Sequence, residues 1–242
     1  MKVFKLLAVT AALSVSGLAM ADDQVVHSGS TFEANQLIPT GVRAEVGTTG
    51  YGGALLWTTN PYVGLALGYN GGNISWRDDV SINGTKYDLD MDNNNTYLNA
   101  EIRPWGASQN MWARSVYMAA GVAYVDNNYD LDKRSSDGII KVNGNNYNFN
   151  GEVSGKMNYD NKIAPYLGLG FAPQINKNWG VFGEVGAYYT GNPDVNLSAK
   201  GEFVNVNDAD FTKDLRAEEN KIANDNKYQW LPVGKVGVSY HW

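Results

Sequence analysis

Apolar and polar residues alternate along eight separate segments of the chain. A period of two places every second side chain on the same face of an extended strand. In the last segment, Val236, Val238 and Tyr240 alternate with Gly237 and Ser239. The pattern predicts strands at 41–48, 51–57, 62–76, 96–103, 115–124, 162–171, 179–191 and 228–242.

The connections between the predicted strands are alternately short and long. Those at 58–61, 104–114 and 173–178 are shorter and each contains proline, which favours a turn. Those at 77–95, 125–161 and 192–227 are much longer. Two of the long connections contain Asn-Gly between alternating residues, in INGTKYDL (82–89) and VNGNNYNF (142–149). Because Asn-Gly is a strong hairpin signal, we expect hairpins that extend the wall beyond the membrane.

This arrangement predicts an all-β fold, an eight-stranded antiparallel transmembrane β-barrel with short periplasmic turns and long extracellular loops. Each strand has about the 9–11 residues that a tilted strand needs to cross a bilayer. The chain ends on an aromatic residue, Trp242, inside the last strand. We therefore expect this strand to close the barrel against the first, with Trp242 at the lipid interface and available to the barrel-assembly machinery.

A soluble barrel of lipocalin type also has alternating strands, and it is the alternative to weigh. Its polar face would have to form a solvent coat. Here the face opposite the apolar one consists mainly of small residues such as Gly64, Ala66 and Gly68, with few charges. A face this small and sparse favours the membrane barrel.

The N-terminus indicates a secretory signal peptide at residues 1–21. Lys2 and Lys5 precede a short apolar stretch from Leu6 to Leu18, and Ala19-Met20-Ala21 forms a cleavage site. No later stretch approaches the length of apolar sequence that a transmembrane helix needs. The expected mature chain, residues 22–242, is a single outer-membrane β-barrel domain located in the cell outer membrane.

Composition narrows the function classes. The chain has no cysteine, so disulfide scaffolds, thiolate metal sites and cysteine nucleophiles are excluded. A net charge of −6 without a basic stripe argues against a nucleic-acid partner. With 27 Gly, 15 Tyr and 7 Trp, the composition suits small-faced strands and aromatic girdles in a lipid bilayer.

The charged residues on the small-residue face are the candidate site. An eight-stranded barrel is only wide enough for side chains to fill it, so charges there must pair. Their formal charges sum to zero, which suits either a salt-bridged plug or the lining of a narrow solute path. These six residues are Arg43, Glu45, Glu101, Arg103, Glu184 and Lys235.

The acidic residues of the long connections can be explained without a specific binding site. Asp88, Asp90 and Asp92 have the spacing that opens a calcium loop, but the required glycine and glutamate are missing, so we expect solvated loop and no metal site. The last connection is rich in acids that could attract cationic solutes or serve solubility. They are Asp208, Asp210, Asp214, Glu218 and Glu219.

Catalysis is not expected, although some small outer-membrane barrels are enzymes. The two histidines, His27 and His241, both belong at the periplasmic end, so a His-based triad at the outer rim is unavailable. No other acid–base set stands out, and no cofactor is implied. A structural or adhesion barrel remains the third class of function.

Five stretches of the sequence resemble a known family, the carbapenem-associated outer-membrane proteins (CarO). They are RAEVGTTGYGGALLW, NPYVGLALGYNGG, YLNAEIRPWGAS, INKNWGVFGEVGAYYTGNP and VGKVGV. The resemblance implies an eight-stranded barrel of the Gram-negative outer membrane. It also implies slow influx of small solutes, amino acids and basic ones such as ornithine in particular, and a link to carbapenem entry and resistance. The alternative is a closed surface barrel without an open pore.

Overall fold

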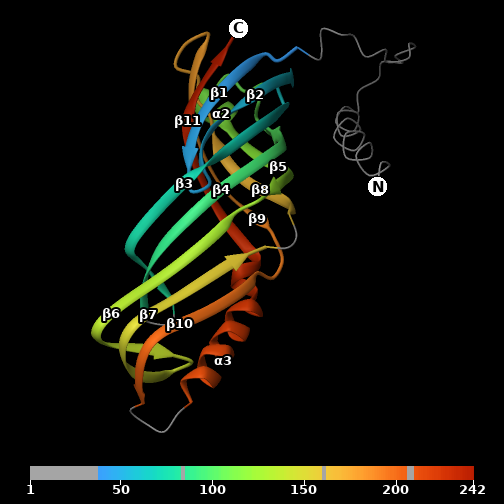
Figure 1. Cartoon of the computed structure of the whole chain (residues 1–242). Helices are drawn as coiled ribbons and strands as arrows, with labels where there is room; N and C mark the ends of the chain where they lie inside the picture. The colour runs from blue at the N-terminus through green and yellow to red at the C-terminus, as the bar shows by residue number, and fades with distance from the viewer. Residues whose placement is uncertain (1–37, 83–84, 160–161, 206–209) are drawn as a thin grey trace.

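The computed structural model describes residues 38–82, 85–159, 162–205 and 210–242, so the expected signal peptide and His27 lie outside the described residues. Its strands form one continuous sheet in which all neighbouring strands are antiparallel (Figure 1). Eight of them close into a ring, which confirms the predicted barrel. In ring order they are β1 (Gly41–Gly47), β2 (Gly50–Asn60), β3 (Val63–Ile82), β4 (Thr85–Ile102), β5 (Val116–Val125), β8 (Ile163–Phe171), β9 (Trp179–Tyr189) and β11 (Trp230–His241).

The first and last strands close the ring, as their sequences predict. Pairing of β1 with β11 runs from Gly41 opposite His241 to Gly47 opposite Lys235. The backbone N–H of Trp242 then donates to the carbonyl oxygen of Thr40 at 3.3 Å. The apolar C-terminal strand is therefore hydrogen-bonded to β1, and the ring has no free strand edge at this point.

The outer surface of the ring carries the apolar face of every strand. Leu67, Leu167 and Val236 are each more than 40% exposed and lie between two girdles of aromatic side chains. One girdle lies at the end where β2–β3, β4–β5 and β8–β9 are joined, called here the short-turn end; the other lies at the opposite, extension end. The first includes Tyr62, Trp105, Trp112, Trp179 and Trp242, and the second includes Tyr51, Tyr69, Tyr124, Tyr189 and Trp230.

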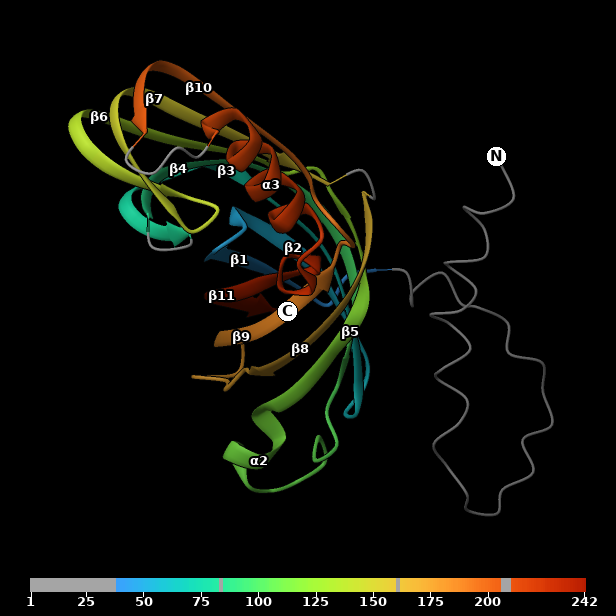
Figure 2. The same ribbon diagram turned by 90° about the horizontal axis from the view of Figure 1, so that it is seen from below.

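The long connections are folded, and they contain the expected hairpins that extend the wall. They form an extension of the barrel wall with a helix on its inner side (Figures 1 and 2). The predicted hairpin at 142–149 is present, with Asn143 and Gly144 at positive φ as a two-residue type I′ turn requires. In the hairpin at 82–89, Ile82 pairs with Thr85, and the turn residues lie outside the described part. The extension comprises β6 (Asn128–Val142), β7 (Asn145–Asn158), β10 (Asp194–Asn205) and α3 (Phe211–Ala223).

The extension begins where strand β4 changes its neighbour. The segment Asn95–Ile102 pairs with β5 inside the ring, whereas Asp88–Asp92 pairs with β6 outside it. At the branch, the backbone N–H of Asn94 donates to the Asn127 side chain at 3.1 Å. A single long strand thus carries both the barrel and the extension, which holds the two parts in one sheet.

Helix α3 covers the concave side of the extension because it shares an apolar cluster with the sheet. Phe211 and Leu215 of the helix pack against buried Ile140, Tyr147 and Val153. The chain then passes through a short 3₁₀ helix, η3 (Asn226–Gln229), into β11. This cluster is a second core, separate from the barrel interior.

One short helix also lies within a predicted turn region. Helix α2 (Met111–Ser115) follows β4 and is capped by the Asn110 side chain, which accepts from Trp112 and Ala113. Five residues are too few to show helical periodicity in a sequence. Among the described residues, no helix has the length and apolar character needed to cross a membrane.

Candidate functional site

The six charged residues singled out in the sequence lie on the inner side of the ring. Residues 43 and 45 alternate with outward-facing Val42 and Val46, so the strand period sends them inward. Five of the six are at most 5% exposed, and Arg103, just after β4, has a side chain that is 22% exposed at the short-turn end. By strand they are Arg43 and Glu45 on β1, Glu101 on β4, Arg103 after β4, Glu184 on β9 and Lys235 on β11.

Glu101 joins two arginines at the short-turn side of the interior. One carboxylate oxygen accepts from Arg43 Nη2 and the other from Arg103 Nη2, each at 2.7 Å. The Arg43 guanidinium also lies 4.1 Å from the centroid of the Phe182 ring. One carboxylate between two guanidiniums leaves this group with one formal positive charge.

Glu184 and Lys235 form a second, neutral pair. They are directly opposite each other on β9 and β11, and Lys235 Nζ lies 3.0 Å from Glu184 Oε1. The hydroxyls of Tyr117 and Tyr166 donate to the two oxygens of Glu184, each at 2.7 Å. This carboxylate is thus fully engaged, as a buried charge requires.

Glu45 is bound differently from the other two glutamates. Its Oε1 accepts from the Tyr97 hydroxyl at 2.6 Å, whereas its Oε2 is buried without a protein hydrogen-bond partner. Among the described residues, no cation lies within ion-pair distance of this carboxylate. Glu45 therefore carries the uncompensated negative charge of the interior.

Four tyrosines fill the space around these charges, and the sequence analysis assigned them no role. Tyr97, Tyr117, Tyr166 and Tyr188 are all at most 1% exposed. Glycines on neighbouring strands make room for the rings: a Cβ on Gly68 would lie 2.3 Å from Tyr97 Cζ. The small residues of the inner face therefore accommodate large aromatic side chains from adjacent strands.

Buried asparagines continue the inner polar face toward the extension. Asn70 lies opposite Asn95 across β3 and β4, and Asn99 follows on β4. All three are at most 2% exposed, and each has a side-chain atom without a protein hydrogen-bond partner. Burying such atoms unpaired costs about 1–3 kcal/mol each, so water is the natural partner here.

The interior adjoins a cavity of about 190 Å³ at the short-turn end. Arg103 contributes to its lining, together with Arg114 and His241. Arg103, which also binds Glu101, therefore lies between this cavity and the buried charges.

The structure places the predicted acidic loops in regular elements. Asp88, Asp90 and Asp92 lie along strand β4, where Asp88 and Asp90 face Asp132 and Asp130 of β6. The expectation of solvated loop is therefore wrong for this segment. Among the described residues, no group of three or more His, Asp or Glu side chains is arranged to hold a metal ion.

The acids of the last connection build the extension. Asp210 caps α3 by accepting from Thr212 N and Lys213 N. Glu218 Oε2 accepts from Asn143 N at 3.0 Å, and Glu219 Oε2 accepts from Leu197 N at 3.2 Å. These contacts add a structural role to the acids, whereas attraction of cationic solutes and solubility stay predictions; Asp208 lies outside the described residues.

Asp214 fastens the β6–β7 hairpin to helix α3. Its carboxylate accepts from the hydroxyl of Tyr147 and from the side-chain amides of Asn145 and Asn143 at 2.6 and 3.1 Å. These donors hold the pKa of the Asp214 carboxyl below its usual value, with Tyr147 as the largest cause. Burial, together with the bond to Asp214, raises the pKa of Tyr147 to about 12.

Comparisons with known proteins place the chain in a family. No protein-family model and no curated protein sequence matches it. A crystal structure of Acinetobacter baumannii CarO is 64% identical, covers 86% of this chain and 100% of its own, and superposes with a TM-score of 0.75. A crystal structure of A. baumannii CarO2 is 62% identical, covers 85% and 99% of the two chains, and has a TM-score of 0.77. At this identity over nearly the whole length, the chain belongs to the CarO family of outer-membrane β-barrel proteins.

Proposed function

We propose that the barrel is a narrow, low-flux channel for small cationic and zwitterionic solutes. The observation that carries the proposal is the polarity of its interior, where Asn70, Asn95 and Glu45 keep buried atoms without protein partners. A barrel built only for stability would be served as well by apolar packing, because replacing buried ion pairs by apolar residues is often neutral or stabilising. Buried polar atoms without protein partners are available to bind water or a small polar solute, which suits a route for small polar molecules.

The charge arrangement supports cationic selectivity at one point of the route. Glu45 offers a free carboxylate oxygen, and the neighbouring Arg43 Nε is a buried donor without a partner. An ammonium group suits the first of these and a carboxylate the second, so a small amino acid matches both. Ornithine adds a second ammonium group, which suits the Glu45 carboxylate because no described cation lies within ion-pair distance of it. The resemblance to the CarO family extends the same proposal to carbapenem entry.

The route requires side-chain movement, which accounts for low flux. Arg43 and Arg103 each lie 2.7 Å from an oxygen of Glu101. The side chains of Tyr97 and Tyr117 fill the interior beside this group. Swinging Arg103 toward the short-turn cavity is the smallest change that separates the group. The competing function is a closed structural barrel, which the tight packing of these tyrosines favours. Neither function gives the protein a catalytic role or a cofactor.

Proteoliposome swelling separates the two functions. Glu45→Gln removes a lumen charge without leaving a paired cation behind, so folding should be retained. We expect ornithine entry to fall about fivefold relative to glycine, as for a barrier change of about 1 kcal/mol. The matched control is Asp130→Asn on the exposed face of the extension, which should leave the ratio unchanged.

Salt provides the second arm of this experiment. An effect from a buried lumen charge should persist at high ionic strength, whereas capture by surface charges should fade. If the wild-type protein admits no ornithine, lysine or glycine beyond the rate of protein-free liposomes at any salt, the channel proposal fails and the closed barrel stands.

A further inference from the structure

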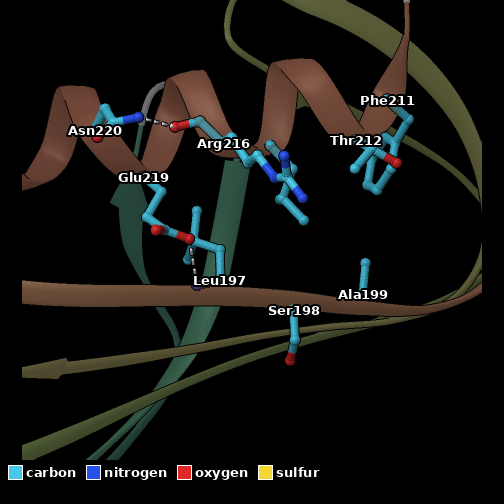
Figure 3. A pocket seen from close by; sticks show the side chains of 9 residues that line it. Leu197, Ser198, Ala199, Phe211, Thr212, Arg216, Glu219 and Asn220 are labelled. Atoms are coloured by element: carbon cyan, nitrogen blue, oxygen red, sulfur yellow. Dashed lines mark hydrogen bonds between the residues drawn. The ribbon is translucent and has the colours of Figure 1, made fainter.

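The extension contains a pocket of its own, far along the sheet from the barrel interior. It lies between helix α3 and strand β10 and encloses about 510 Å³ (Figure 3). Pockets that bind small molecules have volumes of roughly 300–1,000 Å³. The space is therefore large enough for a small organic ligand.

One wall of this pocket is apolar. Leu197 and Ala199 come from β10, and Phe211 and Leu215 come from α3. Ala199, Phe211 and Leu215 also pack against the core of the extension, which holds this wall in place. The wall offers a preformed surface to the apolar part of a ligand.

The other wall is polar and follows one ridge of the helix. Thr212, Arg216 and Asn220 are spaced four residues apart, so they lie on the same side of α3. Figure 3 shows the Arg216 side chain reaching into the space between the helix and β10. A charged group of the ligand would meet this ridge.

Arg216 is the charge in the lining that remains available. Glu219 already accepts from the backbone of Leu197, and the Asn220 side chain donates to the carbonyl oxygen of Arg216. Within the described part of the chain, the Arg216 guanidinium has no ion-pair or hydrogen-bond partner. Arg216 is therefore the lining residue that can bind an anionic group of a ligand.

A peptide strand is a poorer occupant than a small molecule. Among the described strands, β10 pairs only with β7, and an unpaired strand edge is a template for strand addition. However, Glu219 accepts from the Leu197 N–H, which an added strand would need. Helix α3 thus blocks the edge beside the pocket.

We propose that this pocket binds a small organic anion, a carboxylate on an apolar body, from the extracellular side. The apolar body packs against Leu197, Phe211 and Leu215, and the carboxylate accepts hydrogen bonds from Arg216. Thr212 supplies a hydroxyl donor on the same ridge. The site is separate from the barrel interior and does not depend on the channel function.

Three probes with one apolar body test the chemistry. They are 4-(4-fluorophenyl)butyrate, the corresponding alcohol and the corresponding amine, each titrated by ¹⁹F NMR against the purified protein in phosphatidylcholine nanodiscs. Empty nanodiscs measure partitioning into lipid. We expect the acid to bind at least about tenfold more tightly than the alcohol, and the amine more weakly than either, because the bond to Arg216 is charge-assisted.

Paired variants locate the binding. Arg216→Gln should weaken binding of the acid about tenfold and leave the alcohol unchanged. Lys213→Gln removes the same charge from the same helix outside the pocket and should change nothing. Ala199→Leu narrows the pocket and should weaken binding of the acid and the alcohol alike. Both arginine and lysine positions are exposed, so folding, followed by heat-modifiable migration, should be retained.

Two results would overturn the proposal. The first is equal affinity for the acid and the alcohol in the wild-type protein, since the pocket would then not select for charge. The second is an acid affinity that survives Arg216→Gln, or that falls equally in Lys213→Gln, since the anion would then bind elsewhere or through general electrostatics.

Discussion

The barrel and the extension are built from one sheet whose inner side is buried in both, but that inner side is polar in the barrel and apolar in the extension. In the barrel, Glu101 and Lys235 are buried while Leu167 is 62% exposed. In the extension, Ile140 is buried, whereas Asp90 and Asp130 on the outer face are exposed. Strand β4 takes part in both arrangements, since its outward residues change from Leu98 in the ring to acids beyond it.

The contrast shows that the solvent outside the sheet decides whether the polar or the apolar face of an alternating strand is buried. Lipid accepts the apolar face of the ring, so polar residues are left for the interior. Water surrounds the extension, which consequently hides its apolar face beneath helix α3. The same period of two therefore gives a polar core in one region and an apolar core in the other.

The largest effect should come from unpairing a charge in the barrel core. Glu101→Gln leaves Arg43, with a side chain only 3% exposed, without its carboxylate. We expect the free energy of unfolding to fall by about 3–5 kcal/mol, measured by urea titration with heat-modifiable migration as the reporter.

Two further variants decide whether this loss comes from the buried charge. The double variant Arg43→Leu with Glu101→Leu removes the pair together and should recover most of the stability, because Arg103 remains partly hydrated. In the extension, Glu219→Gln should cost only about 1 kcal/mol, since this carboxylate accepts a backbone N–H. Equal costs for Glu101→Gln and Glu219→Gln would show that the two regions treat charge alike.

A second prediction compares the introduction of an arginine on the lipid-facing surface of the barrel and on the water-facing surface of the extension. Leu169, 58% exposed on β8, faces lipid, and Leu169→Arg should destabilise the barrel by about 2–4 kcal/mol if it lies near the midplane. Ile139, 71% exposed on β6, faces water, and Ile139→Arg should change stability by at most about 0.5 kcal/mol. Folded yield after refolding into bilayers measures both, and a reversed order would invert the proposed membrane boundary.

The ring and the identity of its inner charges follow from the sequence because strand period is a local property. Residues such as Arg43 and Glu45 are separated by one apolar residue, so their common face is readable without knowing any partner. The contacts between these side chains cannot be predicted from the sequence, because they depend on the register between strands that are distant along the chain. Lys235 meets Glu184, and Tyr97 meets Glu45, only after the ring has closed.

Helix α3 was missed although its sequence contains a signal. Asp210 precedes a run without Gly or Pro, and Phe211, Leu215 and Ile222 have helical spacing. Nearly half of the run is charged, which favours a solvated loop when the sequence is considered alone. Its apolar face finds a partner only in Ile140 and Val153 of the extension, and this long-range contact cannot be predicted from the local sequence. Packing against the extension therefore determines that residues 211–223 form a helix.

A third prediction concerns the pH dependence of the contact between Asp214 and Tyr147, which attaches the β6–β7 hairpin to α3 in the extension. Asp214 has a lowered pKa in the folded protein, so its stabilisation is complete above the usual value of 3.8 and declines as pH falls below it. Tyr147 has a raised pKa, so its contribution is complete below 10.0 and is lost as pH rises through about 12. The attachment of the hairpin to α3 should therefore weaken at both extremes.

Hydrogen exchange at the tip of the β6–β7 hairpin measures this attachment. The backbone amide of Asn145, whose side chain donates to Asp214, should exchange faster below pH 3.8 after correction for intrinsic rates, while amides of the β1–β11 pair should keep their protection. Asp214→Asn should open the tip by about 2 kcal/mol at neutral pH and abolish the acid-dependent step. An acid-dependent step that persists in Asp214→Asn would assign it to another group.

The smallest expected effect tests whether the extension unfolds independently of the barrel. Asp210 accepts from the first-turn amides of Thr212 and Lys213, so Asp210→Ala should destabilise α3 by about 1 kcal/mol. The matched control, Asp130→Ala, removes an exposed carboxylate from the extension without touching the helix and should stay within about 0.5 kcal/mol. Because α3 covers an apolar core of its own, exchange should rise in α3, β7 and β10 and remain unchanged in β8, β9 and β11. Parallel loss of protection in both groups of strands would instead show that the two oppositely built regions unfold as one unit.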